Sequence, residues 1–253
     1  NMEYERKQYL EQLIKKKDNG RVKVITGLRR SGKSYLLFNL FRNNLMETGV
    51  GEDQIIALAL DEIDNAKYRN PFELNQYVKE RILDKSKRYY VFLDEIQFVL
   101  AVPNPYVDDP EAKLTFIDVV LGLMKIPNVD VYVTGSNSKM LSSDILTQFR
   151  DRGDEIKVYP LSYQEFYEHY DGDKRGAWRD YYTYGGMPLV WTLETHEERS
   201  RYLRDLFSWT YIKDVLERNK IKKDEEVMEI LLHLLASAVG SLTNPTKLSN
   251  TFH

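Results

Sequence analysis

Short apolar runs alternate with amphipathic segments along roughly the first 160 residues of the chain. The apolar runs are rich in β-branched and aromatic residues, which predicts buried strands at 22–26, 55–60, 89–93, 129–134 and, more weakly, 156–159. Between these runs, apolar positions recur at helical spacing, which predicts helices at 4–17, 35–45, 71–83 and 111–124. Strands that alternate with helices indicate an α/β fold, in which helices sandwich a parallel sheet.

The pattern changes after Pro160, where strand-like runs give way to helical periodicity alone. Helices are predicted there at 162–170, 176–184, 197–218 and 224–239. The expected organisation is an N-terminal helix at 1–19, an α/β core at 20–160, an all-helical lid or linker region at 161–241, and the first turns of a further domain at 242–253.

Composition excludes several classes of protein. The 253 residues include no cysteine, which excludes disulfide scaffolds, thiolate metal sites and cysteine nucleophiles. The four histidines are scattered, without the spacing of a metal site. The longest uncharged stretch, 230–246, is too polar to span a membrane, and no signal-peptide pattern opens the chain. We therefore expect a soluble, cytoplasmic protein without membrane contact.

The segment at 27–34, Gly-Leu-Arg-Arg-Ser-Gly-Lys-Ser, matches the pattern GxxxxGK(S/T) between a predicted strand and a predicted helix. Its glycines permit backbone conformations in which successive N–H groups surround phosphate oxygens. Lys33 is expected to reach the β- and γ-phosphates, and the Ser34 hydroxyl to bind Mg²⁺. Arg29 and Arg30 either contact phosphate or pair with an acidic residue. The candidate nucleotide-binding residues are Gly27, Arg29, Arg30, Ser31, Gly32, Lys33, Ser34 and Tyr35.

An acidic pair closes the third predicted strand. Asp94 is a candidate to hold Mg²⁺ through water, and Glu95 is a candidate to polarise the attacking water in hydrolysis. Acidic pairs also cap helices, but the position of this pair on the third strand after the glycine-rich loop favours catalysis. A GTPase needs an Asn-Lys-x-Asp segment to read guanine, and residues 219–222 lack its aspartate, so ATP is favoured.

Two further groups of polar residues complete the candidate site. Ser136 or Asn137, at the tip of the fourth predicted strand, is expected to sense the γ-phosphate; a plain turn is the alternative. Arg152, or else Arg150, is expected to reach into the nucleotide site of a neighbouring subunit as an arginine finger. Ion pairs with the adjacent acidic residues are the alternative for both arginines.

Five segments together carry a family resemblance. They are GLRRSGKS at 27–34, FLDEIQ at 92–97, VYVTGSNSKMLS at 131–142, FRDRGDEIKVYPLSYQEF at 149–166 and YGGMP at 184–188. In this order they resemble the prokaryotic AAA-type P-loop ATPases, whose ATPase domain precedes a C-terminal domain of unknown function. The resemblance covers about residues 3–250.

The resemblance implies an AAA-like core in which one strand separates the strand of the acidic pair from the strand before the glycine-rich loop. Carried over by position, the phosphate, magnesium, water, sensor and finger residues are those named above. It also implies that residues 242–253 begin a winged-helix-like segment, cut short in this chain. No lid arginine is assigned by position, although Arg201 and Arg204 are candidates.

The predicted function is Mg²⁺-dependent hydrolysis of ATP to ADP and phosphate, which drives or gates a conformational change. The alternatives are a nucleotide-gated switch that hydrolyses ATP slowly and a DNA-associated ATPase. Residues 1–33 hold ten basic and four acidic side chains in a chain of net charge −3, which suits polyphosphate or nucleic acid, or a solvated helix face. The expected partners are a second copy of the chain and a protein or DNA bound through the helical and C-terminal region.

Overall fold

The computed structural model describes residues 3–137, 139–142, 144–218 and 232. The chain divides into two compact units, Asn1–Thr195 and His196–His253. The segment 161–195 lies in the first unit, whereas the sequence pattern grouped it with the helices that follow.

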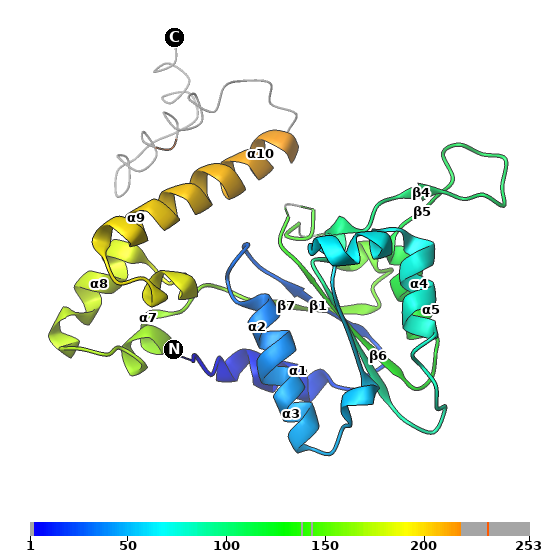
Figure 1. Ribbon diagram of the computed structural model, residues 1–253, viewed down its shortest axis with the longest axis horizontal. Coiled ribbons are helices and arrows are strands. Elements are labelled where there is room, and N and C mark those ends of the chain that lie inside the picture. The colour runs from blue at the N-terminus through cyan, green and yellow to red at the C-terminus, as the bar shows by residue number, and fades with distance from the viewer. Residues whose placement is uncertain (1–2, 138, 143, 219–231, 233–253) are drawn as a thin grey trace, which may run out of the picture. The chain divides into compact units, whose positions relative to one another are not determined.

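Five parallel strands form the sheet of the first unit: β1 (Val22–Thr26), β2 (Ile55–Ala59), β3 (Tyr89–Asp94), β6 (Val129–Gly135) and β7 (Gly153–Lys157). Their order is β2-β3-β6-β1-β7 (Figure 1). Strand β6 separates β3 from β1, as the family resemblance implied. The predicted α/β class with a parallel sheet is confirmed.

Helices cover both faces of this sheet (Figure 1). A π-helical stretch, Leu36–Phe41, joins two of them into one continuous helix after the glycine-rich loop. The α-helices of the first unit are α1 (Lys7–Lys16), α2 (Lys33–Tyr35), α3 (Arg42–Glu47), α4 (Pro71–Lys79), α5 (Phe116–Met124), α6 (Ile145–Gln148), α7 (Tyr163–Glu168) and α8 (Ala177–Tyr184).

Successive residues of β3 pack into two different cores, because side chains alternate between the faces of a strand. Tyr89, Val91 and Leu93 belong to the core that includes α4 and α5. Tyr90 and Phe92 belong to the core that includes α1, the π-helical stretch Leu36–Phe41 and α3. All six residues of β3 are buried, which explains why the strand is an unbroken apolar run until its final aspartate.

The helix predicted at 111–124 is wrong at its beginning, since α5 starts at Phe116. Thr115 caps it: its hydroxyl accepts a hydrogen bond from the Ile117 N–H at 3.2 Å, and Asp118 accepts one from the Thr115 N–H at 2.8 Å. The preceding residues instead form an antiparallel hairpin of β4 (Val102–Pro103) and β5 (Lys113–Leu114).

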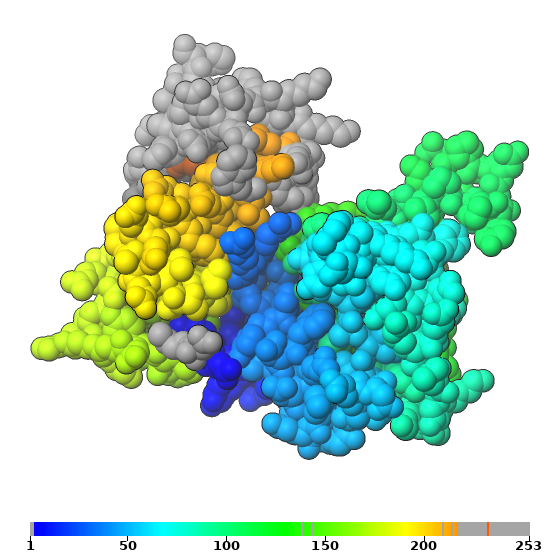
Figure 2. Space-filling model, in the orientation of Figure 1, coloured from blue at the N-terminus to red at the C-terminus, as the bar shows by residue number. Residues whose placement is uncertain are grey.

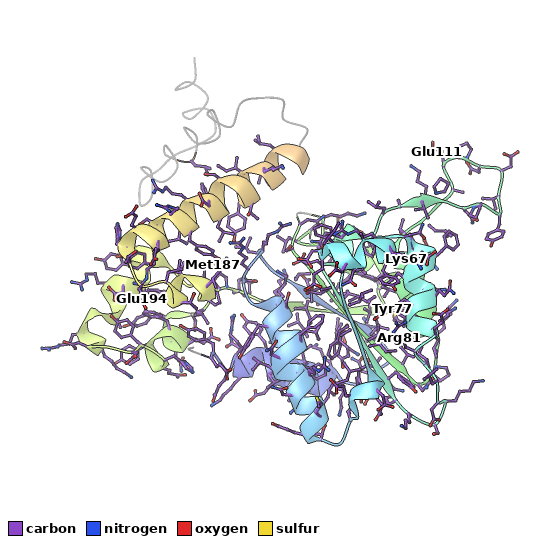
Figure 3. All side chains as sticks on the ribbon, in the orientation of Figure 1. Lys67, Tyr77, Arg81, Glu111, Met187 and Glu194 are labelled. Carbon is purple, nitrogen blue, oxygen red and sulfur yellow. The ribbon has the colours of Figure 1, made fainter. Side chains whose placement is uncertain are left out.

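This hairpin projects from the body of the first unit (Figures 1 and 2). Glu111 lies in the projecting loop (Figure 3), and Tyr106 in the same loop is 86% exposed. Pro103, Pro105 and Pro110 are typical of a loop, but they do not predict the pairing of its two ends.

Two other predicted boundaries differ. Strand β7 begins at Gly153 rather than at 156, because Gly153 pairs in register with Val22 at the start of β1. Helix α4 ends at Lys79 rather than at 83. Apart from residue 232, the helix predicted at 224–239 lies outside the described residues, as does the winged-helix-like segment predicted at 242–253.

The second unit is described through residue 218 and at residue 232. Helix α9 (His196–Asp205), a π-helical stretch (Leu206–Ile212) and α10 (Lys213–Arg218) follow one another without a break, where one helix was predicted at 197–218. Arg201 and Arg204 lie on α9. Within the described part of the chain, no helix is both long and apolar enough to cross a membrane.

Candidate functional site

The carboxyl ends of β1, β3 and β6 meet at one edge of the sheet, because the three strands are parallel neighbours. The glycine-rich loop (residues 27–34) follows β1, the acidic pair ends β3, and Ser136 follows β6. Three of the polar segments predicted from the sequence therefore lie together. Open α/β sheets hold their ligands at this edge.

Two glycines of the loop are required by its geometry. A Cβ at Gly27 would lie 2.3 Å from the carbonyl oxygen of Val158, which is a clash with backbone. Gly32 has a φ of 101°, in the left-handed region that favours glycine, and it immediately precedes α2. The loop thus turns sharply and leads its backbone into the first turn of a helix, where N–H groups lack internal partners.

Lys33 is buried at the centre of this loop, with 3% of its surface exposed. Its ammonium donates hydrogen bonds to the carbonyl oxygens of Gly27 at 3.0 Å and Leu28 at 2.9 Å. Burial lowers the pKa of Lys33, while the charges of Glu95 and Asp94 act in the opposite direction. Among the described residues Lys33 forms no ion pair, so its positive charge is balanced only at a distance.

Ser31 has an orphaned polar atom inside the loop. Its Oγ is buried and has no hydrogen-bond partner among the described residues. A buried hydroxyl without a partner costs free energy, of order 1–3 kcal/mol, unless a ligand or water supplies one. This position fits an oxygen-bearing ligand that enters the loop.

Asp94 joins the loop to β6. Its carboxylate accepts hydrogen bonds from Ser34 Oγ at 2.7 Å and from Thr134 Oγ1 at 2.5 Å. Burial raises the pKa of Asp94, and the two hydroxyl donors oppose that rise. A serine hydroxyl and a carboxylate side by side are hard oxygen donors of the kind that Mg²⁺ binds.

No group of three or more acidic or histidine side chains suited to a metal gathers in the described part of the chain. Mg²⁺ commonly takes one or two protein oxygens together with substrate phosphates and water. The donor set of Ser34 and Asp94 therefore fits a magnesium ion that arrives with a phosphate ligand.

Glu95 adopts an unusual backbone conformation, with a φ of 53° in the left-handed region. Its N–H donates to Thr134 Oγ1 at 2.9 Å. Its carboxylate Oε2 accepts hydrogen bonds from Ser136 Oγ, at 2.7 Å, and from the side-chain amide of Gln97. Both bonds reach the same oxygen, so the carboxylate is held in place by one atom.

Gln97 was not predicted as a site residue. Its amide also lies 3.4 Å from Ser136 Oγ, and its own Oε1 is buried without a hydrogen-bond partner among the described residues. The available signal was its place in FLDEIQ, two residues beyond Glu95 and within the segment that carried the resemblance.

A hollow of about 430 Å³ opens beside the glycine-rich loop. Its apolar wall comes from Tyr4, near the start of the described residues, and from Pro188 and Leu189, which follow the sheet in the sequence. The sequence did not connect these residues with the loop. Met187, whose position Figure 3 labels, directly precedes the 188–192 part of this wall. The hollow is lined by Glu3, Tyr4, Arg6, Arg30, Gly32, Lys33, Ser34, Tyr35, Glu95, Pro188, Leu189 and Thr192.

The structure places the other predicted residues differently. The side chain of Asn137 accepts a hydrogen bond from the Met140 N–H at 2.9 Å and so closes its own turn, whereas Ser136 contacts Glu95. Arg30 lines the hollow, and Arg29 is exposed on the loop.

Arg152 lies far from the glycine-rich loop of its own chain. Its carbonyl oxygen accepts a hydrogen bond from the N–H of Val22, the first residue of β1. Arg152 therefore lies at the amino edge of the sheet. A five-residue strand such as β1 separates this edge from the carboxyl edge by about 17 Å. Arg150 and Asp151 beside Arg152 both have positive φ, and the side chains of Arg150 and Arg152 are exposed.

The parallel sheet, the loop that enters a helix and the acidic strand end define a P-loop nucleoside-triphosphatase fold. Residues 19–167 match the family model described as an AAA domain, and the chain belongs to that family. Residues 175–253 match a domain of unknown function (DUF8612), the combination that the resemblance implied.

Relatives and a solved structure agree with this assignment. An uncharacterized protein of Haemophilus influenzae is 32% identical over 97% of this chain and 58% of its own length. The uncharacterized protein MJ1544 of Methanocaldococcus jannaschii is 25% identical over 91% of this chain and 51% of its own. The chain thus spans little more than half the length of these relatives.

The Walker-type ATPase PABY2304 of Pyrococcus abyssi has a similar fold. The TM-score is 0.52 at 17% sequence identity, over 93% of this chain and 77% of that chain. At this identity the likeness supports the fold and not the activity.

Proposed function

We propose that this chain binds ATP with Mg²⁺ at the carboxyl edge of the sheet and hydrolyses it to ADP and phosphate. The observation that supports this most directly is the hydrogen-bonded chain from Ser34 through Asp94 and Thr134 to Glu95. It brings the two oxygens suited to Mg²⁺ and the carboxylate suited to water activation to one side of the glycine-rich loop.

Each residue has a separate task in this proposal. The ammonium of Lys33 exchanges its two carbonyl partners for phosphate oxygens, which balance a buried charge. Ser34 and Asp94 hold Mg²⁺, which when bound neutralises charge on the phosphates. Glu95 orients the attacking water and accepts its proton, while Ser136 and Gln97 fix the carboxylate through Oε2.

The base is proposed to lie against the apolar wall of the hollow, beside Tyr35, Pro188 and Leu189. Flat apolar rings bind between such side chains, with a few polar groups that set orientation. We infer adenine because the sequence lacks the guanine-reading segment. Cytoplasmic location and a conformational change driven by hydrolysis are parts of the same proposal.

Arg152 acts in this proposal on a neighbouring copy of the chain. Its place at the amino edge keeps it from the loop of its own subunit, and its exposure leaves it accessible to another subunit. An arginine supplied in this way stabilises charge that develops during phosphoryl transfer.

The test replaces Glu95 with glutamine. Glu95→Gln should retain binding of Mg·ATP while turnover falls at least about a hundredfold, the low end of what a positioned base contributes. Turnover and the dissociation constant are measured with ATP and with GTP over a range of protein concentrations. Glu111→Gln, the same chemical change in the projecting hairpin, is the matched control and should leave both values unchanged.

The possible outcomes distinguish the proposed ATPase from the two alternative functions. Turnover that rises more steeply than protein concentration supports a site completed by Arg152 of a second copy. Unchanged turnover in Glu95→Gln removes the role of Glu95. Tight ATP binding with a single slow turnover in the unmodified chain favours the nucleotide-gated switch, and ATP hydrolysis that DNA stimulates favours the DNA-associated reading.

A further inference from the structure

Arg6 is a buried arginine that no motif pointed to. It precedes α1 with a φ of 45°, in the left-handed region, and only 4% of its side chain is exposed. A conformation of this kind is strained for a non-glycine residue, and burial of a guanidinium adds to the free-energy cost. Such a residue persists where contacts with its surroundings hold it in place.

The guanidinium of Arg6 bonds to three residues, all of which are distant from it in the sequence. Nη1 donates to the carbonyl oxygen of Ser31, at 3.1 Å, inside the glycine-rich loop. Nη2 donates to the carbonyl oxygen of Tyr159, at 2.6 Å, just after β7. Nε forms an ion pair with Glu165 of α7, at 2.9 Å. One side chain thus ties the loop to the region beyond the sheet.

The bond to Ser31 has a direct consequence for phosphate binding. A trans peptide unit is planar, and its C=O and N–H point in opposite directions. When Arg6 holds the carbonyl oxygen of Ser31, the N–H of Gly32 points away from Arg6. That N–H belongs to the glycine-rich loop, whose amides are the groups that surround a phosphate. Arg6 therefore sets the direction of the Gly32 N–H, which is one of these amides, through its bond to the other side of the same peptide unit.

The bond to Glu165 reaches the wall of the hollow. The other carboxylate oxygen of Glu165 accepts a hydrogen bond from the Ser162 N–H at 2.9 Å and so caps α7. The next residue back, Leu161, donates its N–H to the carbonyl oxygen of Gly186 at 2.7 Å. Gly186 lies two residues before Pro188, where the 188–192 wall begins.

We propose that Arg6 is a positioning residue that links the phosphate-binding backbone of the glycine-rich loop to the wall at 188–192. Occupation of the loop and the position of the wall are then coupled through one guanidinium. The inference rests on the proposed nucleotide site and extends it to a residue that lies outside the ATPase motifs. Arg6 also borders a second, polar hollow of about 370 Å³ lined in part by Glu5, Glu165 and His169.

The experiment measures nucleotide affinity in Arg6 variants of the same chain. Arg6→Ala should raise the dissociation constant of a non-hydrolysable ATP analogue, and the KM for ATP, about tenfold or more, because charge-assisted hydrogen bonds to the loop are lost. Turnover at saturating ATP should change less than about threefold. Arg6→Lys keeps the charge but not the three-way geometry, and should recover only part of the affinity.

Arg88→Ala is the matched control. Arg88 also joins a carboxylate to a backbone carbonyl, through Asp18 at 2.8 Å and Pro127 at 2.7 Å, but at the amino edge of the sheet. It should leave the dissociation constant unchanged. An equal rise in both variants, or an unchanged dissociation constant in Arg6→Ala, would overturn the proposal.

Hydrogen exchange tests the coupling itself and covers the case in which Arg6→Ala fails to fold. In the unmodified chain, bound analogue should slow amide exchange at 186–192. Glu165→Gln keeps the bond between Arg6 and Ser31 but removes the charge on α7, and should weaken that slowing while the chain stays folded. Full slowing in Glu165→Gln would contradict the link.

These results distinguish this inference from the proposed function. If the unmodified chain binds no nucleotide, both fall together. If it binds the analogue and Arg6→Ala binds equally well, only the role of Arg6 falls. If it binds but does not hydrolyse ATP, the proposed catalysis falls and the role of Arg6 stands on the affinity and exchange data.

Discussion

The two edges of the sheet each bury a lysine, and they treat it in opposite ways. At the amino edge, Lys23 is fully buried and forms an ion pair with Asp130, which also accepts hydrogen bonds from Tyr132 Oη at 2.7 Å and the Asp18 N–H at 2.9 Å. At the carboxyl edge, Lys33 is nearly as buried, but its hydrogen-bond partners among the described residues are the backbone carbonyls of Gly27 and Leu28.

This difference shows at which edge the protein itself neutralises the buried charge of the lysine. Burial lowers the pKa of both lysines. Asp130 neutralises the charge of Lys23 through a direct ion pair, whereas Asp94 and Glu95 stabilise the charge of Lys33 from further away. The carboxyl edge also contains the orphaned Ser31 Oγ and Gln97 Oε1. In the described part of the chain, the carboxyl edge thus has buried polar atoms without partners, whereas the buried lysine of the amino edge is paired. This contrast indicates that a charged ligand belongs at the carboxyl edge.

The largest effect that tests this contrast is on stability. Lys23→Ala should lower the free energy of unfolding by about 3–5 kcal/mol, because it leaves Asp130 buried without its cation. Lys33→Ala should change the same quantity by less than about 1 kcal/mol, since its lost hydrogen bonds are offset by removal of a buried charge. Urea unfolding of both variants measures this. Equal losses in the free energy of unfolding would contradict the contrast between the two lysines.

The next effect concerns the orientation of Glu95. Ser136→Ala removes one of the two hydrogen bonds on its carboxylate and should lower turnover about tenfold with little change in KM. Asn137→Ala removes a bond within a turn and should lower turnover less. Steady-state kinetics of the pair decides between the two sensor candidates; a larger loss in Asn137→Ala would reverse the assignment.

The smallest expected effect lies at the amino edge and depends on pH. Burial raises the pKa of Asp154, but hydrogen bonds from Asn19 and Arg21 outweigh it and leave the pKa below its ordinary 3.8. A carboxyl whose folded pKa is lowered stabilises the fold above its unfolded pKa, and that stability is lost as pH falls through the folded value. The pair with Arg21 is partly exposed, so the contribution is below about 1 kcal/mol.

Asp154→Asn should remove that contribution. The variant and the unmodified chain should differ in urea midpoint at neutral pH and converge as the pH falls through the lowered pKa of Asp154. Lys33→Ala should show the full acid dependence of the unmodified chain. A constant difference between Asp154→Asn and the unmodified chain at all pH values would mean that the carboxyl charge is not the cause.

What the sequence predicted depended on local pattern. The strands, the glycine-rich loop and the acidic pair are each written in consecutive residues, and the parallel sheet brought Ser34, Asp94 and Glu95 together as expected. Arg6, Gln97 and the 188–192 wall were missed because their roles depend on contacts between distant segments, such as the ion pair from residue 6 to residue 165. No periodicity records such a contact. The hairpin at 102–114 was missed because each of its strands is only two residues long.

The left-handed backbone of Glu95 has a consequence for how this chain can change. A glycine at that position would adopt the same conformation without strain, and relief of the strain would favour folding by about 1 kcal/mol. It would also delete the carboxylate that faces the hollow. If hydrolysis depends on Glu95 as proposed, selection for folding and selection for activity act on this position in opposite directions, and loss of the activity would allow a glycine to replace the glutamate.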